Sequence, residues 1–128
     1  RLDYRQVPIV WGDKVSSNYS NNVKVLVSSS SPYIFLFDRD NQTFTVYESS
    51  PTKVNDNYKT SFKLYYMFRF KFDLSATNTR VVDVAVPEST NDRPELYVLT
   101  TDGLNKINLY EFIDSLKAQK SLKEVTEQ

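Results

Sequence analysis

Carboxylates are the side chains of this sequence best suited to acid–base or metal chemistry. Asp38 and Asp40 form one close pair, and Glu95 and Asp102 form a second acidic pair. A glycosidase needs two carboxylates facing each other across a cleft, whereas Asp in a loop commonly forms a turn with its own backbone. Asp38, Asp40 and Asn41 also offer oxygen ligands for Ca²⁺, but the central Gly and terminal Glu of the calcium-loop motif are missing. We therefore interpret these residues as turn formers.

Several enzyme classes are excluded by missing residue types. The chain has no His and no Cys, so it has no imidazole base, thiol nucleophile, Cys/His zinc site or disulfide. The serines at 28–31 consequently have no imidazole to activate them. Gly12 and Gly103 are the only glycines, which excludes a glycine-rich phosphate loop. We expect a protein that is not an enzyme and uses no cofactor or metal.

A basic segment is the clearest indication of a ligand. Several phosphates bound at once need several cations at one place, and strand alternation would put the last three cations of this segment on one face. An ordinary solvated strand face is the competing interpretation. Sixteen basic and sixteen acidic side chains cancel, which disfavours nucleic acid as the main partner. The candidate residues for an anionic ligand or a membrane are Lys53, Lys59, Lys63, Arg69 and Lys71, against the single acidic Asp56.

Three tyrosines in and beside this segment are candidates for contact with a partner protein. They are Tyr58, Tyr65 and Tyr66. Exposed tyrosine is enriched at protein interfaces because it combines a large apolar ring with a polar tip. Tyrosine also covers sheet edges in the absence of any partner, so a purely structural role for these three residues is the alternative interpretation.

Strands dominate the first hundred residues, and a chain of 128 residues is expected to form one domain, 1–128. In 62–72 the pattern puts the even-numbered apolar residues on one face and the odd-numbered, partly basic residues on the other. We expect the polar run 48–61 to be a long loop, and Asp102–Gly103 to be a two-residue hairpin turn. Strands are predicted within 7–15 and over 23–27, 33–37, 43–47, 62–72, 81–86, 96–101 and 104–108.

The last part of the chain changes to a helical period. Leu109, Phe112, Ile113 and Leu116 fall at i, i+3, i+4 and i+7, which predicts an amphipathic helix over about 109–122. Asn108 is placed to cap this helix. The core is expected to span about 7–122, followed by a polar tail at 123–128. The fold class is therefore mostly β (α+β), with one helix after all the strands.

This order resembles that of a pleckstrin-homology (PH) domain. Pro32 to Asp38 and Thr45 to Ser49 are similar to the second and third strands of that family. Arg93 to Gly103 resembles its sixth strand and turn, and Phe112 to Lys117 its closing helix. The resemblance implies a seven-stranded antiparallel barrel or sandwich capped by one C-terminal helix. Three features depart from the family: the only Trp is Trp11 rather than a residue of the helix, the connection from Gly103 to the helix is shorter than usual, and the usual Lys-x-Arg cluster is absent.

A fragment of a β-propeller is the main rival fold. Tyr33 to Tyr47 and Leu96 to Tyr110 share a strand, an Asp-containing turn and a strand ending in Tyr-Glu. The repeats begin about sixty residues apart, which is longer than a usual blade. Small folds of the NTF2-like and immunoglobulin-like kinds are further alternatives.

The resemblance implies a non-catalytic adaptor module that docks a partner protein inside a larger intracellular protein, aided by weak contact with anionic membrane. Phosphoinositide or anionic-lipid binding that targets a membrane is the alternative, and a propeller fragment acting as a scaffold is the second. No run of apolar residues is long enough for a transmembrane helix. Small secreted domains usually carry disulfides, so we expect a cytoplasmic protein, with nuclear or peripheral membrane location as variants.

Overall fold

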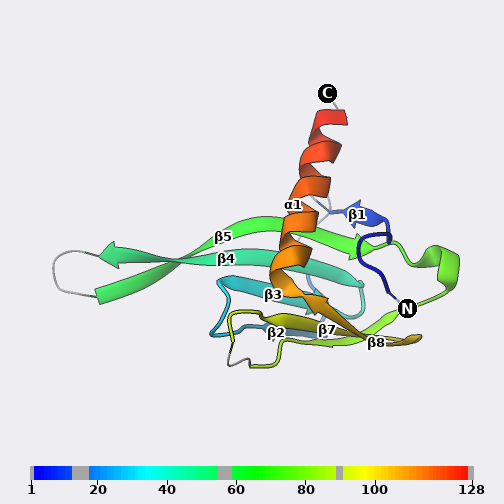
Figure 1. Ribbon diagram of the computed structural model, residues 1–128, viewed down its shortest axis with the longest axis horizontal. Coiled ribbons are helices and arrows are strands. Elements are labelled where there is room, and N and C mark those ends of the chain that lie inside the picture. The colour runs from blue at the N-terminus through cyan, green and yellow to red at the C-terminus, as the bar shows by residue number, and fades with distance from the viewer. Residues whose placement is uncertain (1, 13–17, 55–58, 89–90, 127–128) are drawn as a thin grey trace.

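Two antiparallel sheets and one long helix make up the computed structural model (Figure 1). The structure describes residues 2–12, 18–54, 59–88 and 91–126, and for 52–54 and 59–60 it describes the backbone alone. The larger sheet has the strand order β1-β5-β4-β3-β2, and the smaller has the order β6-β7-β8. This agrees with the predicted fold class at the level of a mostly β protein with one C-terminal helix.

The larger sheet is built from β2 to β5, with β1 added at one edge. β2, β3, β4 and β5 pair in chain order, as successive antiparallel hairpins, and β1 pairs with the end of β5. The predicted hairpin over 33–47 is confirmed, with a turn between Asp38 and Thr43. The strand bounds are β1 Ile9–Trp11, β2 Val23–Leu26, β3 Tyr33–Asp38, β4 Thr43–Val54 and β5 Lys59–Phe72.

The smaller sheet follows along the chain, after a short 3₁₀ turn at Ser75–Thr77. Its strands are β6 Val81–Ala85, β7 Glu95–Thr100 and β8 Gly103–Asn108. The expected hairpin between β7 and β8 is present, but its turn lies one residue earlier than predicted. Thr100 pairs with Gly103, so the two turn residues are Thr101 and Asp102. Gly103 opens β8 with φ of 143°, a backbone conformation that favours glycine.

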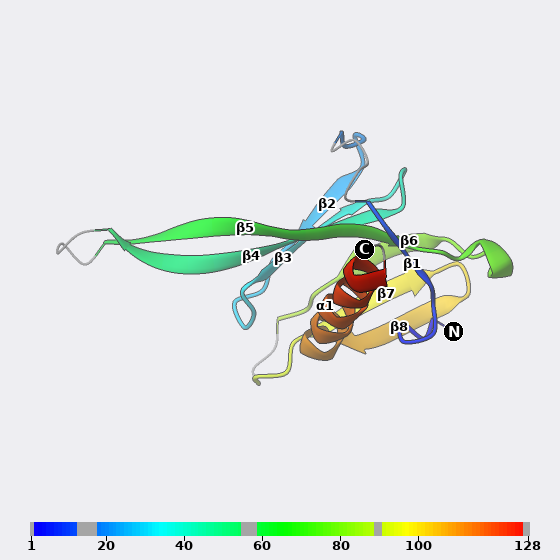
Figure 2. The same ribbon diagram turned by 90° about the horizontal axis from the view of Figure 1, so that it is seen from above.

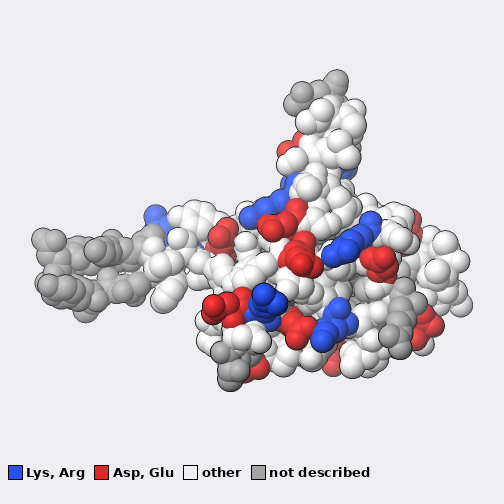
Figure 3. All heavy atoms as spheres, viewed as in Figure 1, with Lys and Arg blue, Asp and Glu red and all other residues white. Residues whose placement is uncertain are grey.

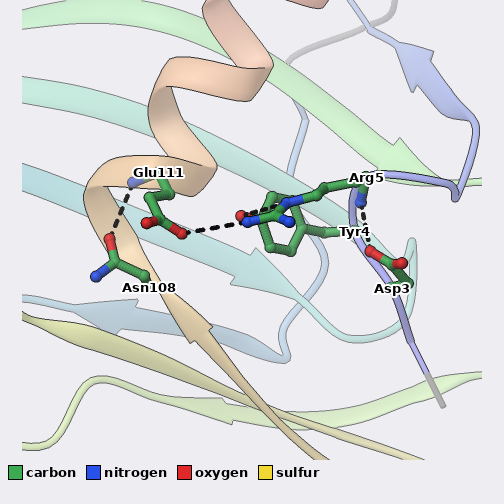
Figure 4. Close-up of polar contacts among 5 residues, drawn as sticks. All are labelled: Asp3, Tyr4, Arg5, Asn108 and Glu111. Atoms are coloured by element: carbon green, nitrogen blue, oxygen red, sulfur yellow. Dashed lines mark hydrogen bonds and ion pairs between the residues drawn. The ribbon is translucent and has the colours of Figure 1, made fainter.

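Helix α1, Leu109–Thr126, starts where predicted and continues four residues beyond the expected end. The Asn108 side chain caps it, because its Oδ1 accepts a hydrogen bond of 3.0 Å from the backbone N–H of Glu111 (Figure 4). On the other side of the first turn, the Arg5 guanidinium forms a 3.4 Å ion pair with the Glu111 carboxylate. The N-terminal segment is thereby placed against the start of the helix.

The core lies between the two sheets and the first half of α1. Phe112, Ile113 and Leu116 are buried, as the helical period predicted. The Phe112 ring lies 6.0 Å from the rings of both Phe70 and Phe72, so the helix contacts the larger sheet directly. We call this helix-facing side of the larger sheet the inner face, and the opposite side the outer face.

The polar run 48–61 is not the long loop that was predicted. β4 continues to Val54 and β5 begins at Lys59, so the two strands form a long two-stranded ribbon that extends away from the body (Figures 1 and 2). We call residues 48–54 and 59–66 the arm. Pro51 suggested a loop because proline has no N–H to donate to a β-ladder and is found in strands mainly at a sheet edge. In the arm, β4 has β5 on one side and no described strand on the other beyond Ser49.

Two further expectations need correction. The predicted first strand, 7–15, is reduced to Ile9–Trp11, and the part from 13 lies outside the described residues. The propeller alternative is not supported, because the chain forms one sheet of five strands and one of three rather than a repeated four-stranded blade. None of the described helices combines the length and apolar character needed to cross a bilayer.

Leu116→Ala is expected to lower the free energy of unfolding by about 3 kcal/mol, because it leaves a cavity where the helix meets the core. Leu122 is on the same helix but is 64% exposed, so Leu122→Ala should change it by less than about 0.5 kcal/mol. Urea denaturation followed by circular dichroism measures both. Equal losses from the two variants would contradict the packing of the first half of α1 into the core.

Candidate binding surface

The predicted basic segment does not form one patch. A β-bulge in β5 divides it: Val46 pairs with Phe68 and Tyr47 pairs with Tyr66, which leaves Met67 without an opposite residue. Such an extra residue reverses the side-chain alternation of the strand from that point on. The prediction that residues 62–72 keep one apolar face is therefore wrong.

The cations of this segment fall on different sides as a result. Arg69, opposite Thr45, and Lys71 lie on the outer face, whereas Lys63, opposite Ser50, lies on the inner face. The expectation that Lys63, Arg69 and Lys71 share a face is thus contradicted by the register. The side chains of Lys53 and Lys59, and the whole of Tyr58, lie outside the described residues.

Arg69 is buried, with 5% of its surface exposed. Its Nη2 donates a 3.3 Å hydrogen bond to Thr43 Oγ1, and its guanidinium carbon lies 5.3 Å from the centre of the Tyr19 ring. The backbone carbonyl of Arg69 accepts a 2.8 Å hydrogen bond from Gly12 N. Arg69 therefore holds the segments around 12 and 19 against the sheet, and its charge is largely shielded from solvent.

Beside Arg69 lies a hollow of about 340 Å³ on the outer face. The exposed Lys71 and the amides of Asn18 and Asn41 supply polar groups, and Val10 supplies an apolar wall. One exposed ammonium with amide donors suits a single carboxylate or phosphate oxygen rather than a cluster of phosphates. Among the described residues there is also no group of three or more acidic side chains that could hold a metal ion.

Asp38 is buried on the outer face, next to this hollow. Its buried carboxylate accepts hydrogen bonds from the Ser20 backbone (2.8 Å) and hydroxyl (2.6 Å), and from the Asn41 backbone (3.2 Å) and amide (2.9 Å). Burial alone would raise the pKa of the Asp38 carboxyl, but these four hydrogen bonds outweigh burial and lower the pKa to about 2. The interpretation of Asp38 as a turn residue is confirmed, and Asp40 accepts hydrogen bonds from the Asn22 amide nearby.

The outer face of the arm and its base is apolar and exposed. Phe62, Leu64 and Tyr66 follow one another there, with exposed fractions of 68%, 60% and 52%. The Tyr66 ring packs edge-on against Tyr47 at 5.9 Å, and Tyr47 in turn lies opposite Ile34. We call this set the arm surface: Ile34, Tyr47, Pro51, Phe62, Leu64 and Tyr66.

A hollow of about 560 Å³ lies at the edge of the arm surface. Ile34, Pro51 and Phe62 line it together with Val27 and the 28–32 segment. Every side chain of the arm surface is uncharged, although a quarter of the whole chain is charged. Contiguous exposed apolar patches of this kind commonly mark protein contacts.

Of the three tyrosines proposed for protein contact, only one belongs to this surface. Tyr66 lies on the outer face, whereas Tyr65 is 50% exposed on the inner face, opposite Glu48. Phe62 and Leu64 were missed as site residues because their alternation indicated a buried face. The bulge gives no signal in the sequence, since Tyr66, Met67 and Phe68 are all apolar.

Charges on the face that carries α1 are mixed. Figure 3 shows Lys and Arg interspersed with Asp and Glu over the body and the base of the helix. A lipid-binding pocket would need a concentration of one sign, and this face does not display one. No protein-family model, curated protein or solved structure matches the chain.

We expect Asp38→Asn to lower the free energy of unfolding by about 2.5 kcal/mol near neutral pH, because its folded pKa lies well below the unfolded value. A lowered pKa contributes stability that is present above about pH 4 and is lost as the pH falls through about 2. The difference between the variant and the natural chain should therefore shrink below about pH 4. Denaturation at a series of pH values measures it.

Asp92→Asn is the matched control, since Asp92 is an exposed loop residue, and it should change stability by less than about 0.5 kcal/mol. A gap between Asp38→Asn and the natural chain that stays constant from neutral pH to about pH 2 would show that the Asp38 charge does not contribute as argued.

Proposed function

We propose that this chain is a non-catalytic, PH-like adaptor module that docks a partner protein through the arm surface. The observation that carries the proposal is the row of Phe62, Leu64 and Tyr66, each more than half exposed and without a charged neighbour on that face among the side chains that the structure describes. Burying three such side chains would contribute several kcal/mol to binding, at about 25 cal/mol per Å² of apolar area.

The order of the elements supports the PH-like part of the proposal. On this proposal β2 to β5 would be the first four strands of that family, β6 to β8 the other three, and α1 its closing helix. β1 would be an addition, paired with the end of β5. The buried start of α1 would be the part of the family's helix that closes the core.

The described cations favour a protein partner over an anionic lipid. Arg69 is shielded, and Lys63 and Lys71 lie on opposite faces of the larger sheet. Among the described side chains of this segment, lipid headgroups would therefore meet one cation at a time rather than a cluster. The apolar contact of the arm surface should also depend little on salt, because salt screens charges and leaves apolar burial in place.

A photo-crosslinking amino acid in place of Phe62 tests the proposal in extract from the source cells. We expect discrete crosslinked proteins at position 62 that persist at about 0.5 M salt and disappear when Leu64→Ser and Tyr66→Ser are added. The same crosslinker in place of Leu104, which is 62% exposed on the smaller sheet, is the control and should give none.

Equal products from positions 62 and 104 would overturn the proposal, because exposure alone would then explain the contact. Sedimentation with anionic vesicles is a second test. If the chain bound vesicles and Lys63→Glu with Lys71→Glu abolished binding, while the Leu64→Ser and Tyr66→Ser substitutions did not, the lipid alternative would replace the protein-docking proposal.

A further inference from the structure

The outer face of the larger sheet stays apolar beyond the arm. Val25 on β2 lies opposite Leu36 on β3, and Val27 lines the same hollow as Ile34 at the edge of the arm surface. Val25 and Val27 are each 60% exposed. We call the combined set the apolar face: the arm surface (Ile34, Tyr47, Pro51, Phe62, Leu64 and Tyr66) together with Val25, Val27 and Leu36.

β3, beneath this face, lacks the alternation of a sheet that has one side in water. Such a strand alternates apolar and polar residues, whereas a strand covered on both sides is an almost continuous apolar run. β3 is apolar at every position from Tyr33 to Phe37: Phe35 and Phe37 are buried on the inner face, and Ile34 and Leu36 lie on the outer face. The composition of β3 therefore indicates that its outer face is also covered.

In the described part of the chain, only one end of the outer face has such a cover. There the Tyr19 hydroxyl donates a 3.3 Å hydrogen bond to Thr45 Oγ1, and the Tyr19 ring lies over the Arg69 guanidinium. α1 and the smaller sheet lie on the other side of the larger sheet (Figure 2). The described residues form no second layer over the apolar face, so a cover there has to come from outside this part of the chain.

The size of the apolar face matches that of a stable dimer contact. At about 200 Å² for a fully exposed large side chain, its residues together expose roughly 700 Å². The largest apolar patch of a typical monomer is about 300–600 Å², whereas a stable interface covers about 800 Å² on each partner. The apolar face is thus larger than a monomer usually exposes and close to what a dimer needs.

The chemistry of the apolar face favours a second copy of the chain over a different protein. Transient interfaces are about as polar as the rest of a protein surface, whereas homodimer interfaces are more apolar. No residue of the apolar face is charged, so a two-fold axis through it brings no like charges together. The sixteen basic and sixteen acidic side chains of the whole chain also cancel, so two copies carry no net repulsion.

We propose that two copies of this chain pack through their apolar faces, sheet against sheet, about a two-fold axis. Each copy then supplies the layer that the outer face of the other lacks. This inference rests on the proposed function, because it uses the arm surface for docking, and it deepens that function by identifying the docked protein as a second copy.

Sedimentation equilibrium of the purified chain tests the self-association. Half of the chain should be dimeric at about 10 µM or below, since interfaces of this size have micromolar or tighter affinity. Val27→Ser with Leu64→Ser should weaken the dimer at least about a hundredfold, because each substitution occurs twice in a symmetric contact. The control pair is Leu104→Ser with Leu122→Ser, at residues that are 62% and 64% exposed, and it should stay within about twofold.

Single introduced thiols locate the contact. The chain has no Cys, so an alkylating reagent modifies only the thiol that is introduced. Alkylation of Val27→Cys and of Leu64→Cys should slow at least about fivefold at protein concentrations where the dimer predominates. Alkylation of Leu104→Cys and of Leu122→Cys should keep the same rate at every concentration.

Three results would overturn the inference: a chain that is still monomeric at about 200 µM, equal weakening by the two serine pairs, or protection of the thiol at 104 or 122 instead of those at 27 and 64. If the chain stays monomeric while position 62 specifically crosslinks a different protein, the second copy is wrong and the docking proposal stands. If concentration protects the thiols at 27 and 64 but position 62 crosslinks no more than position 104 in extract, the self-contact stands and the adaptor function fails by itself.

Discussion

The contact of Phe112 with Phe70 and Phe72 is the interaction on which the rest of the structure depends. α1 continues directly from the last strand of the smaller sheet, and these rings join it to the larger sheet. The smaller sheet has one apolar face, which must be buried against another element. The helix supplies the missing partner for both sheets, and Ile113 and Leu116 complete the same buried face.

The position of that contact also determines where the core ends. Phe68, Phe70 and Phe72 are buried on the inner face, beneath the helix. The part of β5 before Met67 is exposed, and no described helix or second sheet packs on it. The arm is therefore stabilised mainly by its own cross-strand pairs, such as Tyr47 with Tyr66. Two-stranded ribbons are marginal in water without further packing, so a partner on the arm would stabilise the segment it binds.

Local signals in the sequence were sufficient for the parts of the fold that local interactions determine. The Asn108 cap, the helical spacing of Leu109 to Leu116 and the hairpin around Asp38 were all predicted, because each depends on residues a few positions apart. The length of the arm was not predicted, since polar residues beside Pro51 are typical of a loop. The arm forms because β4 pairs with β5 along its whole length. That pairing joins residues too far apart along the chain for a local pattern to predict it.

The candidate site was harder to predict for a related reason. Phe62 and Leu64 continue the apolar alternation of Phe68 to Phe72, and nothing in that pattern distinguishes the covered residues from the exposed ones. Arg69 likewise belongs to a basic run in the sequence, yet Tyr19 and Thr43 surround it in the fold. Burial at both places depends on segments far away along the chain.

The single extra residue at Met67 has a consequence for how such a ribbon could diverge between related chains. Losing Met67 would only remove the bulge, because Val46 would stay opposite Phe68 and Tyr47 opposite Tyr66. Gaining one residue in β4 opposite Met67 would instead turn the outer part of the ribbon over relative to the body, so that Phe62, Leu64 and Tyr66 exchanged sides with Lys63 and Tyr65. A one-codon insertion in β4 could in this way reverse which chemistry the ribbon presents, while every residue of the hydrophobic interior stayed in place.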